Sequence, residues 1–584
     1  MATRPRIVKA VVPPEEGGDS GPDRAAEAAP GGVEGDAAEP VDPDFDESTY
    51  LRAFPDIAEA VRRGVLESGL AHYRQAGRAE MRLEKAEYRA LLAAYAGPAP
   101  PQVALDTLTI SRSGATLMTG WSDDRFDQLT EISLETRPQI RHNWAAFPRL
   151  ARGDVERTLE AASGHRFGFL LVAAPVGGSS APSIDPRAAN APTFRFASGI
   201  ETQLRRDPVV ATDADLRDLA LAALPTAAVG ELDPEVIYSI LDQHVGVQIA
   251  AINRLIIEQA RLRRFIERFG PARIRYRGSV ITMLRGGADQ MGPRLALAAG
   301  GPGADEYEFI VAVSNADQFE PALRAARLAE ATLGLSLTLV LQPDGDPAGT
   351  GEDAGADIAR SDRLIFMDQA VLPRAPDWAL RHSALLDDAP AAQTRLFGGM
   401  LYRPDGALSH GGYYFERETS LLPRPRDLPR RITEIRLKAV THSAAAAKSL
   451  PPVRPVTGIP AAFMSVDRAW FETLGGFTRH YSRAAHEDID LCLRSLRRGV
   501  SPWIHPLPMW HFERRNPVRA EPSKGGAILN GWLLHRQWDP MIVQDLLGPE
   551  PASPPASSND PVPLELPLLN QAEAAAAPLV GVES

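Results

Sequence analysis

Apolar residues downstream of position 278 are gathered into short runs separated by polar or amphipathic stretches. The runs occupy positions 280–284, 309–313, 337–341 and 364–367, and apolar side chains recur at helical spacing over 319–333. Short apolar runs that alternate with helical segments are typical of a parallel sheet whose strands are connected by helices packed on its faces. We therefore predict that residues 271–547 form an α/β domain with a mostly parallel, Rossmann-like sheet.

The pattern upstream of position 271 predicts three further regions. In 45–95, apolar residues recur at helical spacing between a Pro-Asp pair and single glycines, which indicates a small helical module. In 96–200, short alternating segments separated by turn residues favour a β-rich, sandwich-like accessory domain. In 201–270, a long amphipathic stretch predicts a helical connector to the α/β domain.

The helix of the connector and the two ends of the chain have clear sequence limits. Asp233 is the predicted N-cap, followed by a proline at the first helical position, and the helix is expected to end near Gly270. Residues 1–44, which are acidic overall, and 548–584 contain few large apolar residues. Such segments cannot bury enough surface to order themselves, so we expect both to be disordered tails.

Composition and charge exclude several classes of function. A net charge of -12 over 584 residues argues against a general nucleic-acid binder, which needs a basic surface. Cys492 is the single cysteine, so neither an internal disulfide nor a cysteine-based zinc site is expected. No apolar run reaches the roughly 18 to 20 residues of a spanning helix, and residues 1–30 lack the apolar core of a signal peptide. We expect a cytoplasmic protein, with peripheral attachment to the inner membrane left open.

The densest group of carboxylates lies directly ahead of an apolar helical pattern. Glu487, Asp488 and Asp490 begin this pattern, which stops at Gly499. Acidic residues in a first helical turn complement the helix dipole, so a structural role alone would account for them. They are preceded, however, by a strand and a short helix closed by Gly-Gly-Phe, and are followed by a strand that leads to His511. Structural and catalytic interpretations both remain open on these grounds.

This order of elements resembles the C-terminal half of the catalytic domain in the family-two glycosyltransferases, which are inverting enzymes with the GT-A fold. The matching motifs are Ser465-Val466-Asp467-Arg468, the segment from Phe471 to Phe477, the segment from Glu487 to Arg494 with Gly499, and His511. The resemblance covers about residues 279–547. It implies a GT-A type nucleotide-diphospho-sugar transferase domain in which the accessory regions precede the catalytic one.

The resemblance also implies roles for individual residues. Asp488 would be the general base, and Glu487 would contact the acceptor or orient its loop. Ligands of open α/β sheets bind beyond the carboxyl ends of the strands, so the donor site is expected there. His410 is either a residue of this cleft or a packing residue. The candidates for donor and nucleotide binding are Arg285, Asn315, Asp317, Asp353 and Asp368, and the implied metal ligands are Asp368 and His511.

Two departures from the family pattern concern the donor side. Residues 314–317 read Ser-Asn-Ala-Asp, where family members have aspartates that contact the nucleoside. In the Asp-x-Asp element, Asp368 fills the first position but Ala370 fills the last. Mn²⁺ and Mg²⁺ are hard cations that prefer oxygen ligands, carboxylates above all. Unless Asp368, His511 and waters compensate for the missing carboxylate, the divalent metal that the resemblance implies is therefore expected to be held weakly.

The glycine-rich segment 349–355 raises a second interpretation. Its spacing differs from the G-x-G-x-x-G pattern of dinucleotide-binding proteins, and no strand runs directly into it. We therefore reject a dehydrogenase. The resemblance places this segment in a loop ahead of the strand that carries the Asp-x-Asp element.

Two functions follow from the sequence. The first is an active transferase that moves a sugar from a nucleotide-diphosphate donor to a glycan or protein acceptor during bacterial cell-surface polysaccharide or glycoconjugate biosynthesis, beside other proteins of that process. The second is a catalytically degenerate protein of the same fold that binds glycans or acts as a scaffold, because a fold does not determine a function. Retention of Asp488 and His511 favours the first, and Asn315 and Ala370 favour the second.

Overall fold

The chain divides into two compact units, residues 1–99 and 100–584. The computed structural model describes residues 47, 50–51, 54–77, 102–123, 128–134, 140–143, 149–150, 152–159, 166–175, 185–186, 191–228, 234–262, 264–342, 350–422, 430–482, 486–512 and 521–548. The predicted tail 1–44 lies outside these residues, as does the predicted tail 548–584 except for Gly548.

The first unit contains a small helical module. Helix α2 spans Pro55–Arg62, α3 spans Gly69–His72, and a π-helical turn covers Tyr73–Gly77. The Ser68 side chain caps α3 by accepting a hydrogen bond from the amide of Ala71. Tyr50, Ile57 and Tyr73 form its buried core. The predicted helical module is confirmed for the described part of 45–95.

The second unit begins with two sheets that face each other and are antiparallel except where residues 109–111 pair in parallel with residues 209–211. Leu108, Met118 and Phe169 of one sheet share a core with Ile132 and Phe194 of the other, as expected for a sandwich. The predicted β-rich region is confirmed. The first sheet has the order β5-β6-β2-β1-β9 and the second β4-β3-β7-β8, with β1 at Val103–Ser111, β2 at Thr116–Ser122, β3 at Leu129–Leu134, β4 at Ile140–Asn143, β5 at Arg149–Leu150, β6 at Gly168–Ala173, β7 at Thr193–Phe196, β8 at Glu201–Gln203, β9 at Val209–Ala211 and a short helix α5 at Gly153–Thr158.

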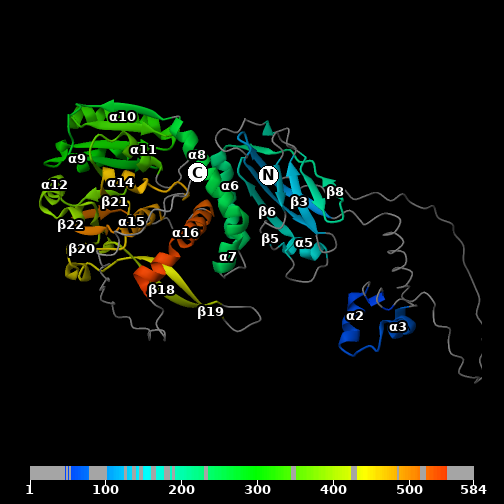
Figure 1. Ribbon diagram of the computed structural model, residues 1–584. Coiled ribbons are helices and arrows are strands. Elements are labelled where there is room, and N and C mark those ends of the chain that lie inside the picture. The colour runs from blue at the N-terminus through cyan, green and yellow to red at the C-terminus, as the bar shows by residue number, and fades with distance from the viewer. Residues whose placement is uncertain are drawn as a thin grey trace, which may run out of the picture. The chain divides into compact units, whose positions relative to one another are not determined.

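Helices cover the outer face of the first sheet. Leu117 and Leu170 of that sheet pack against Leu216 and Ile249 of these helices, and Trp532 of the C-terminal helix joins the same cluster. The elements are α6 at Asp213–Ala228, α7 at Pro234–Ile240, a π-helical turn at Leu241–Val245, α8 at Gly246–Leu262 and α16 at Glu521–Met541, which is followed by a π-helical turn at Ile542–Leu547. In Figure 1 these helices stand between the β-rich region and the α/β domain.

The connector helix differs from its prediction. It is interrupted by the π-helical turn and ends at Leu262 instead of continuing to Gly270. Residues Phe265–Phe269 form strand β10, which pairs antiparallel with Leu337–Leu341 at the edge of the large sheet. The available strand edge provides backbone partners that the local apolar spacing does not reveal, so tertiary pairing overrides the helical pattern.

The α/β domain is built on an eleven-stranded sheet with the main order β10-β13-β12-β11-β14-β21-β16-β22-β15. Strands β13, β12, β11 and β14 are parallel to their neighbours in this group. They coincide with the four predicted apolar runs, so the predicted α/β class is confirmed. Beyond β14 the sheet is mixed, because β21 runs antiparallel to both β14 and β16. The bounds are β11 Gly278–Leu284, β12 Tyr307–Val313, β13 Leu337–Leu341, β14 Arg363–Met367, β15 Val371–Pro373, β16 Leu396–Tyr402, β17 Leu408–His410, β20 Arg454–Pro455, β21 Phe463–Asp467 and β22 Trp503–His511.

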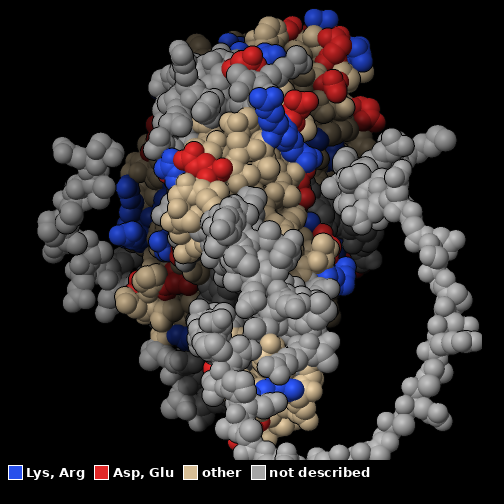
Figure 2. Space-filling view, turned by 90° about the vertical axis from the view of Figure 1, so that its right-hand side faces the viewer, with Lys and Arg blue, Asp and Glu red and all other residues tan. Residues whose placement is uncertain are grey.

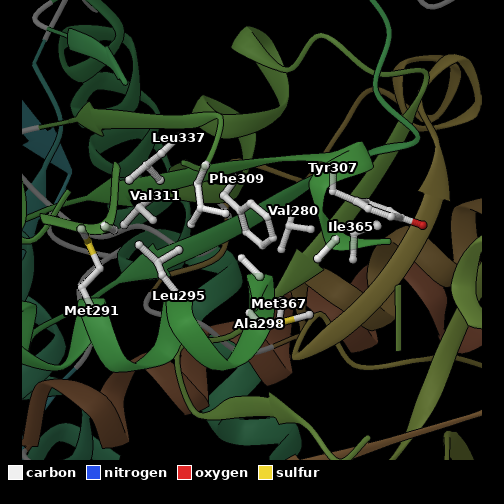
Figure 3. Packing of buried hydrophobic residues seen from close by; sticks show 14 of the residues in the cluster. Val280, Met291, Leu295, Ala298, Tyr307, Phe309, Val311, Leu337, Ile365 and Met367 are labelled. Carbon is white, nitrogen blue, oxygen red and sulfur yellow. The ribbon is translucent and has the colours of Figure 1, made fainter. Parts of the chain in front are cut away.

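Alternate side chains of the parallel strands enter two separate cores, one on each face of the sheet. Figure 3 shows Met291 and Leu295 of helix α9 packed against Phe309 and Val311 on the first face. On the second face, Phe366 shares a core with Phe471 of helix α14 and with Ile489 of helix α15, which carries the acidic cluster. The helices are α9 at Met291–Ala299, α10 at Ala316–Leu333, α11 at Thr350–Ile358, α12 at Trp378–Asp388, α13 at Ala391–Thr394, α14 at Arg468–Leu474 and α15 at Glu487–Arg497, with 3-10 turns at Ala288–Gln290, Ala304–Glu306 and Ala446–Ser449.

Gly351 and Gly355 of segment 349–355 serve packing and lie in a helix. Residues from Thr350 onward form helix α11. A Cβ atom at Gly351 would lie 1.9 Å from the Met283 sulfur, and one at Gly355 would lie 2.4 Å from Ile281. The predicted loop is therefore wrong for the described residues, because these glycines allow the helix to approach strand β11 closely.

A long two-stranded hairpin leaves the domain near the sheet edge. Strand β18 spans Tyr413–Leu422 and pairs antiparallel with β19 at Arg430–Ala439. Figure 1 shows it extending away from the large sheet. Its first residue, Tyr413, remains tied to the domain because the Tyr413 amide donates to the carbonyl of Gly458 at 2.7 Å. The base of the hairpin is thereby fixed beside the first turn of α15.

The described surface carries charges of both signs. Figure 2 shows lysine and arginine side chains interspersed with aspartate and glutamate over the described part of one face. Among the described residues, no helix combines the length and apolar character that a membrane crossing requires.

Candidate active site

A cavity of about 420 Å³ opens beyond the carboxyl ends of strands β11 and β14. This is the edge at which open α/β sheets bind ligands, and the volume lies within the range of small-molecule sites. The wall contains one arginine, four carboxylates and three histidines among its described residues. These are Arg285, Glu352, Asp368, His410, His486, Glu487, Asp488 and His511.

The acidic cluster reaches the cavity because the chain turns sharply before α15. His486 adopts φ 77°, and it is the only non-glycine among the described residues with positive φ. Left-handed backbone is unfavourable for such a side chain and often marks functional sites. The turn places Glu487 and Asp488 in the first helical turn, where both line the cavity wall.

Asp488 is held by donors from three segments of the chain. The amide of Ile489 donates to Oδ1 at 2.8 Å. The amide of Ala461 and the hydroxyl of Tyr413 both donate to Oδ2 at 3.2 Å. Burial raises the pKa of Asp488 above its ordinary value, while these donors oppose the rise by stabilising the ionised form. Asp488 is therefore the member of the pair better suited to carry the negative charge.

Glu487 has the opposite environment. It is 6% exposed, and its Oε2 atom has no hydrogen-bond partner among the described residues. Burial, followed by the charge of neighbouring Asp488, raises the pKa of Glu487 to about 8. Glu487 is therefore the favoured site for a proton on the pair at neutral pH.

Asp490, the third carboxylate of the cluster, does not face the cavity. It is fully buried and accepts hydrogen bonds from Thr478 at 2.5 Å, from Arg494 at 2.9 Å and from the Trp538 indole at 2.8 Å. These contacts tie α15 to the preceding loop and to the C-terminal helix. Asp490 thus has a structural role, and Arg494 pairs with it inside the domain.

Arg285 provides the positive charge of the cavity wall. It follows strand β11, and its guanidinium lies 3.4 Å from Asp368 Oδ2 and 3.4 Å from Glu352 Oε1. Its backbone amide donates to the side chain of Gln369 at 3.1 Å. Contacts with helix α11 and with the turn after β14 therefore fix the position of this arginine.

Asp368 and its surroundings do not fit a divalent metal held by the protein. Oδ1 of Asp368 accepts the Ala370 amide at 2.6 Å, and Oδ2 faces the Arg285 guanidinium. The alanine supplies no ligand, whereas Mn²⁺ and Mg²⁺ require oxygen donors. Within the described part of the chain, no group of three or more His, Cys, Asp or Glu side chains has the arrangement of a metal site. The metal implied by the resemblance is thus not supported by this donor set.

Two histidines complete the wall near the base of the hairpin. His511 ends β22 beside β15, and its Nδ1 lies 3.4 Å from the Ser409 hydroxyl. His410 accepts the Gly412 amide at Nδ1 (3.1 Å), and its ring packs edge-on against Tyr413. Burial lowers the pKa of His410 to about 3, so the ring is neutral and its proton resides on Nε2. His410 both packs and lines the cavity.

Three of the predicted donor residues lie outside the cavity wall. Asn315 caps helix α10 by accepting the Asp317 amide at 2.8 Å, and both side chains are exposed. Asp353 is buried and accepts the Phe477 amide at 3.2 Å, which holds the Gly-Gly-Phe turn. None of the three is among the residues that line the cavity. The other candidates, Arg285, Asp368, Glu487, Asp488 and His511, are brought together in its wall.

Three titratable residues of the cavity wall were absent from the predicted site, namely Glu352, Tyr413 and His486. Glu352 adjoins the predicted Asp353 in helix α11. The Glu352 side chain contacts Arg285, whereas the Asp353 side chain accepts the Phe477 amide. Tyr413 lies three positions after His410, a candidate cleft residue, and this proximity was a weak sequence signal for it. The positive φ of His486 has no counterpart in the sequence pattern.

Comparisons with known proteins give distant structural similarity alone. No protein-family model matches the chain, and no curated protein is similar to it. A mannosyltransferase from Pyrobaculum calidifontis, solved with GDP-Man and Mn²⁺, is 16% identical with a TM-score of 0.29, over 51% of this chain and 70% of that one. GalNAc-T7, solved with UDP, GalNAc and Mn²⁺, is 14% identical with a TM-score of 0.30, over 44% and 48% of the two chains. Similarities this distant carry no argument about the activity of this protein.

Proposed function

We propose that this protein is an inverting glycosyltransferase of GT-A type that takes a sugar from a nucleotide-diphosphate donor. The observation that carries the proposal is the buried Glu487–Asp488 pair in one cavity with Arg285, beyond the carboxyl ends of parallel strands. The pair supplies a base, and the arginine supplies a cation for a leaving diphosphate. The order of sequence motifs from position 456 to His511 supports the same assignment.

The proposed reaction is a direct displacement at the anomeric carbon. An acceptor hydroxyl attacks this carbon while the Asp488 carboxylate accepts its proton, and the bond to the nucleoside diphosphate breaks with both electrons retained by the leaving oxygen. Attack from the face opposite the leaving group inverts the anomeric configuration. Protonated Glu487 donates a hydrogen bond to the acceptor, and Arg285 balances the charge that develops on the diphosphate.

The biological setting is a further part of the proposal. We assign the transferase activity to residues 271–547, with the 45–95 module serving protein interaction or packing, the 96–200 region as an accessory domain, and the 201–270 region as the connector between that domain and the catalytic one. The acceptor would be a glycan or protein of bacterial surface polysaccharide or glycoconjugate synthesis. The reaction would take place in the cytoplasm or at the inner face of the membrane, where nucleotide sugars are made.

A second candidate is a glycan-binding or scaffold protein that keeps this fold without the activity. Ala370 favours it, since the residue removes a carboxylate from the donor side, and so does Asn315, whose side chain is used to cap helix α10. The retained cavity and the buried carboxylate pair favour the enzyme, because an unneeded buried pair of carboxyl groups destabilises a protein. Fold alone does not decide between them.

The decisive experiment measures nucleotide release from a panel of nucleotide sugars, with and without Mn²⁺, in the presence of candidate glycan acceptors. The wild-type chain is compared with Asp488→Asn, which keeps the shape of the side chain. We expect release by the wild type and a loss of about 10² to 10⁴ in rate for the variant. Binding without release in every condition would support the scaffold, and unchanged activity of the variant would refute Asp488 as the base.

A further inference from the structure

The donor side of the cavity has Ala370 where the family pattern places a metal-binding carboxylate, and the Arg285 guanidinium lies beside the remaining Asp368. Asp368 has its Oδ1 atom in a hydrogen bond with the Ala370 amide, and its Oδ2 atom lies 3.4 Å from the Arg285 guanidinium. A dication bound to Asp368 would therefore meet a fixed positive charge at close range. The methyl group of Ala370 offers no ligand to offset that repulsion.

Arg285 is positioned from three sides. Strand β11 supplies its backbone, Glu352 of helix α11 contacts Nη2 at 3.4 Å, and the Gln369 side chain accepts its backbone amide at 3.1 Å. It is the only lysine or arginine among the described residues that line the cavity. A guanidinium matches the geometry of phosphate oxygens and can bind them through two parallel N–H donors.

We propose that this protein binds the diphosphate of its donor through Arg285 and transfers the sugar without a divalent metal. The inference rests on the proposed function and specifies its cofactor requirement. Asp368 and Glu352 act as positioning residues that hold the guanidinium at the edge of the sheet. His410 adds a neutral donor to the same cavity, since its Nε2 atom carries the ring proton and has no hydrogen-bond partner among the described residues.

Isothermal titration of the full chain with UDP, GDP, ADP, CDP and dTDP, each in EDTA or in excess Mn²⁺, tests the proposal. We expect at least one nucleotide to bind in EDTA, with a Kd within about threefold of that in Mn²⁺, since no metal contributes to the site. Arg285→Gln should weaken that binding by about 10-fold to 100-fold, the usual effect of losing charged hydrogen bonds. The affinity of Arg285→Lys should lie between those of the wild type and Arg285→Gln, because lysine keeps the positive charge but lacks the two parallel N–H donors of the guanidinium.

Two further variants separate a lost contact from a damaged fold. Arg381→Gln removes an exposed arginine of helix α12 that pairs with Asp377, and it should bind as the wild type does. The double variant Arg285→Gln with Ala370→Asp removes the fixed cation and restores a second carboxylate, so it should bind nucleotide only in Mn²⁺. Thermal unfolding of each variant shows whether it is folded.

The possible outcomes distinguish this inference from the function on which it rests. Binding that requires Mn²⁺ in the wild type, or that is unchanged in folded Arg285→Gln, would overturn the metal-free site and leave the transferase proposal intact. Absence of binding by every nucleotide in both conditions would overturn the transferase proposal and this inference with it. Release of nucleotide in EDTA from the donor sugar of the binding nucleotide would support both.

Discussion

Glu487→Gln should stabilise the protein, and the gain should grow with pH. The pKa of Glu487 is about 8 in the folded protein, against an ordinary value of 4.5. The folded state therefore holds the proton more tightly than the unfolded state does, so stability is highest below pH 4.5 and is lost as pH rises toward 8. Glutamine has no proton to lose, and it reproduces the shape of the protonated acid.

The size of the effect follows from the same two values. Each pKa unit is worth about 1.4 kcal/mol, so the raised pKa of Glu487 lowers the free energy of unfolding by about 1 kcal/mol at pH 5, about 3 at pH 7 and about 5 at pH 9. The groups that act on Glu487 are Asp488, Glu352 and Arg285, with His486 adjacent in the chain. All of them remain in the variant, so the difference between the two proteins isolates Glu487.

Urea unfolding at pH 5, 7 and 9, followed by a signal from the α/β domain, measures these differences. The matched control is Glu472→Gln, which replaces an exposed glutamate of helix α14 that pairs with Arg468. Exposed substitutions of this kind change stability by about 0.5 kcal/mol or less. A difference for Glu487→Gln that stays constant between pH 5 and 9, or that favours the wild type at pH 9, would refute a buried, protonated Glu487.

Three other predictions concern activity and packing. The pH profile of kcat/KM should rise as Asp488 ionises, at a pH above that of an ordinary aspartate, and fall near pH 8 as Glu487 ionises. Glu487→Gln should remove the fall near pH 8. If the fall persists in this variant, it belongs to a group other than Glu487. Tyr413→Phe removes a donor to Asp488, so the acid limb should move to higher pH without loss of the fold, whereas an unmoved limb would contradict the contact. Gly355→Ala places a Cβ against Ile281 and should cost about 1 to 3 kcal/mol in urea unfolding, while Gly292→Ala, where nothing lies within 4 Å, should not.

Local patterns in the sequence were sufficient for the elements whose partners are their near neighbours. The four apolar runs became strands β11 to β14, and the short helix after Asp467 begins where that residue caps it, with the Trp470 amide bonded to its side chain at 2.9 Å. Helix α15 starts at Glu487, as the acidic cluster and the apolar pattern indicated. These features depend on interactions within one turn or one strand, which the residue order encodes directly.

The same patterns misled where a distant segment competed. The connector helix ended early because residues Phe265–Phe269 pair with β13, which lies 68 to 76 positions later in the chain. The resemblance placed segment 349–355 in a loop, whereas Gly351 and Gly355 lie in helix α11 and leave space for strand β11. The directions of the strands after β14 were left unpredicted, because those strands carry no local mark of their direction and the sheet becomes mixed there.

The sequence by itself therefore determined the α/β class, the strands that carry the cavity, and the residue types of the acidic cluster. The tertiary structure decided which of those residues share a site. It joined Arg285 to Asp368 across 83 positions and Tyr413 to Asp488 across 75, and it turned Asp490 away into the core. It also set the protonation of Glu487, because a pKa depends on burial and on charges that folding brings close, and neither is contained in the order of neighbouring residues.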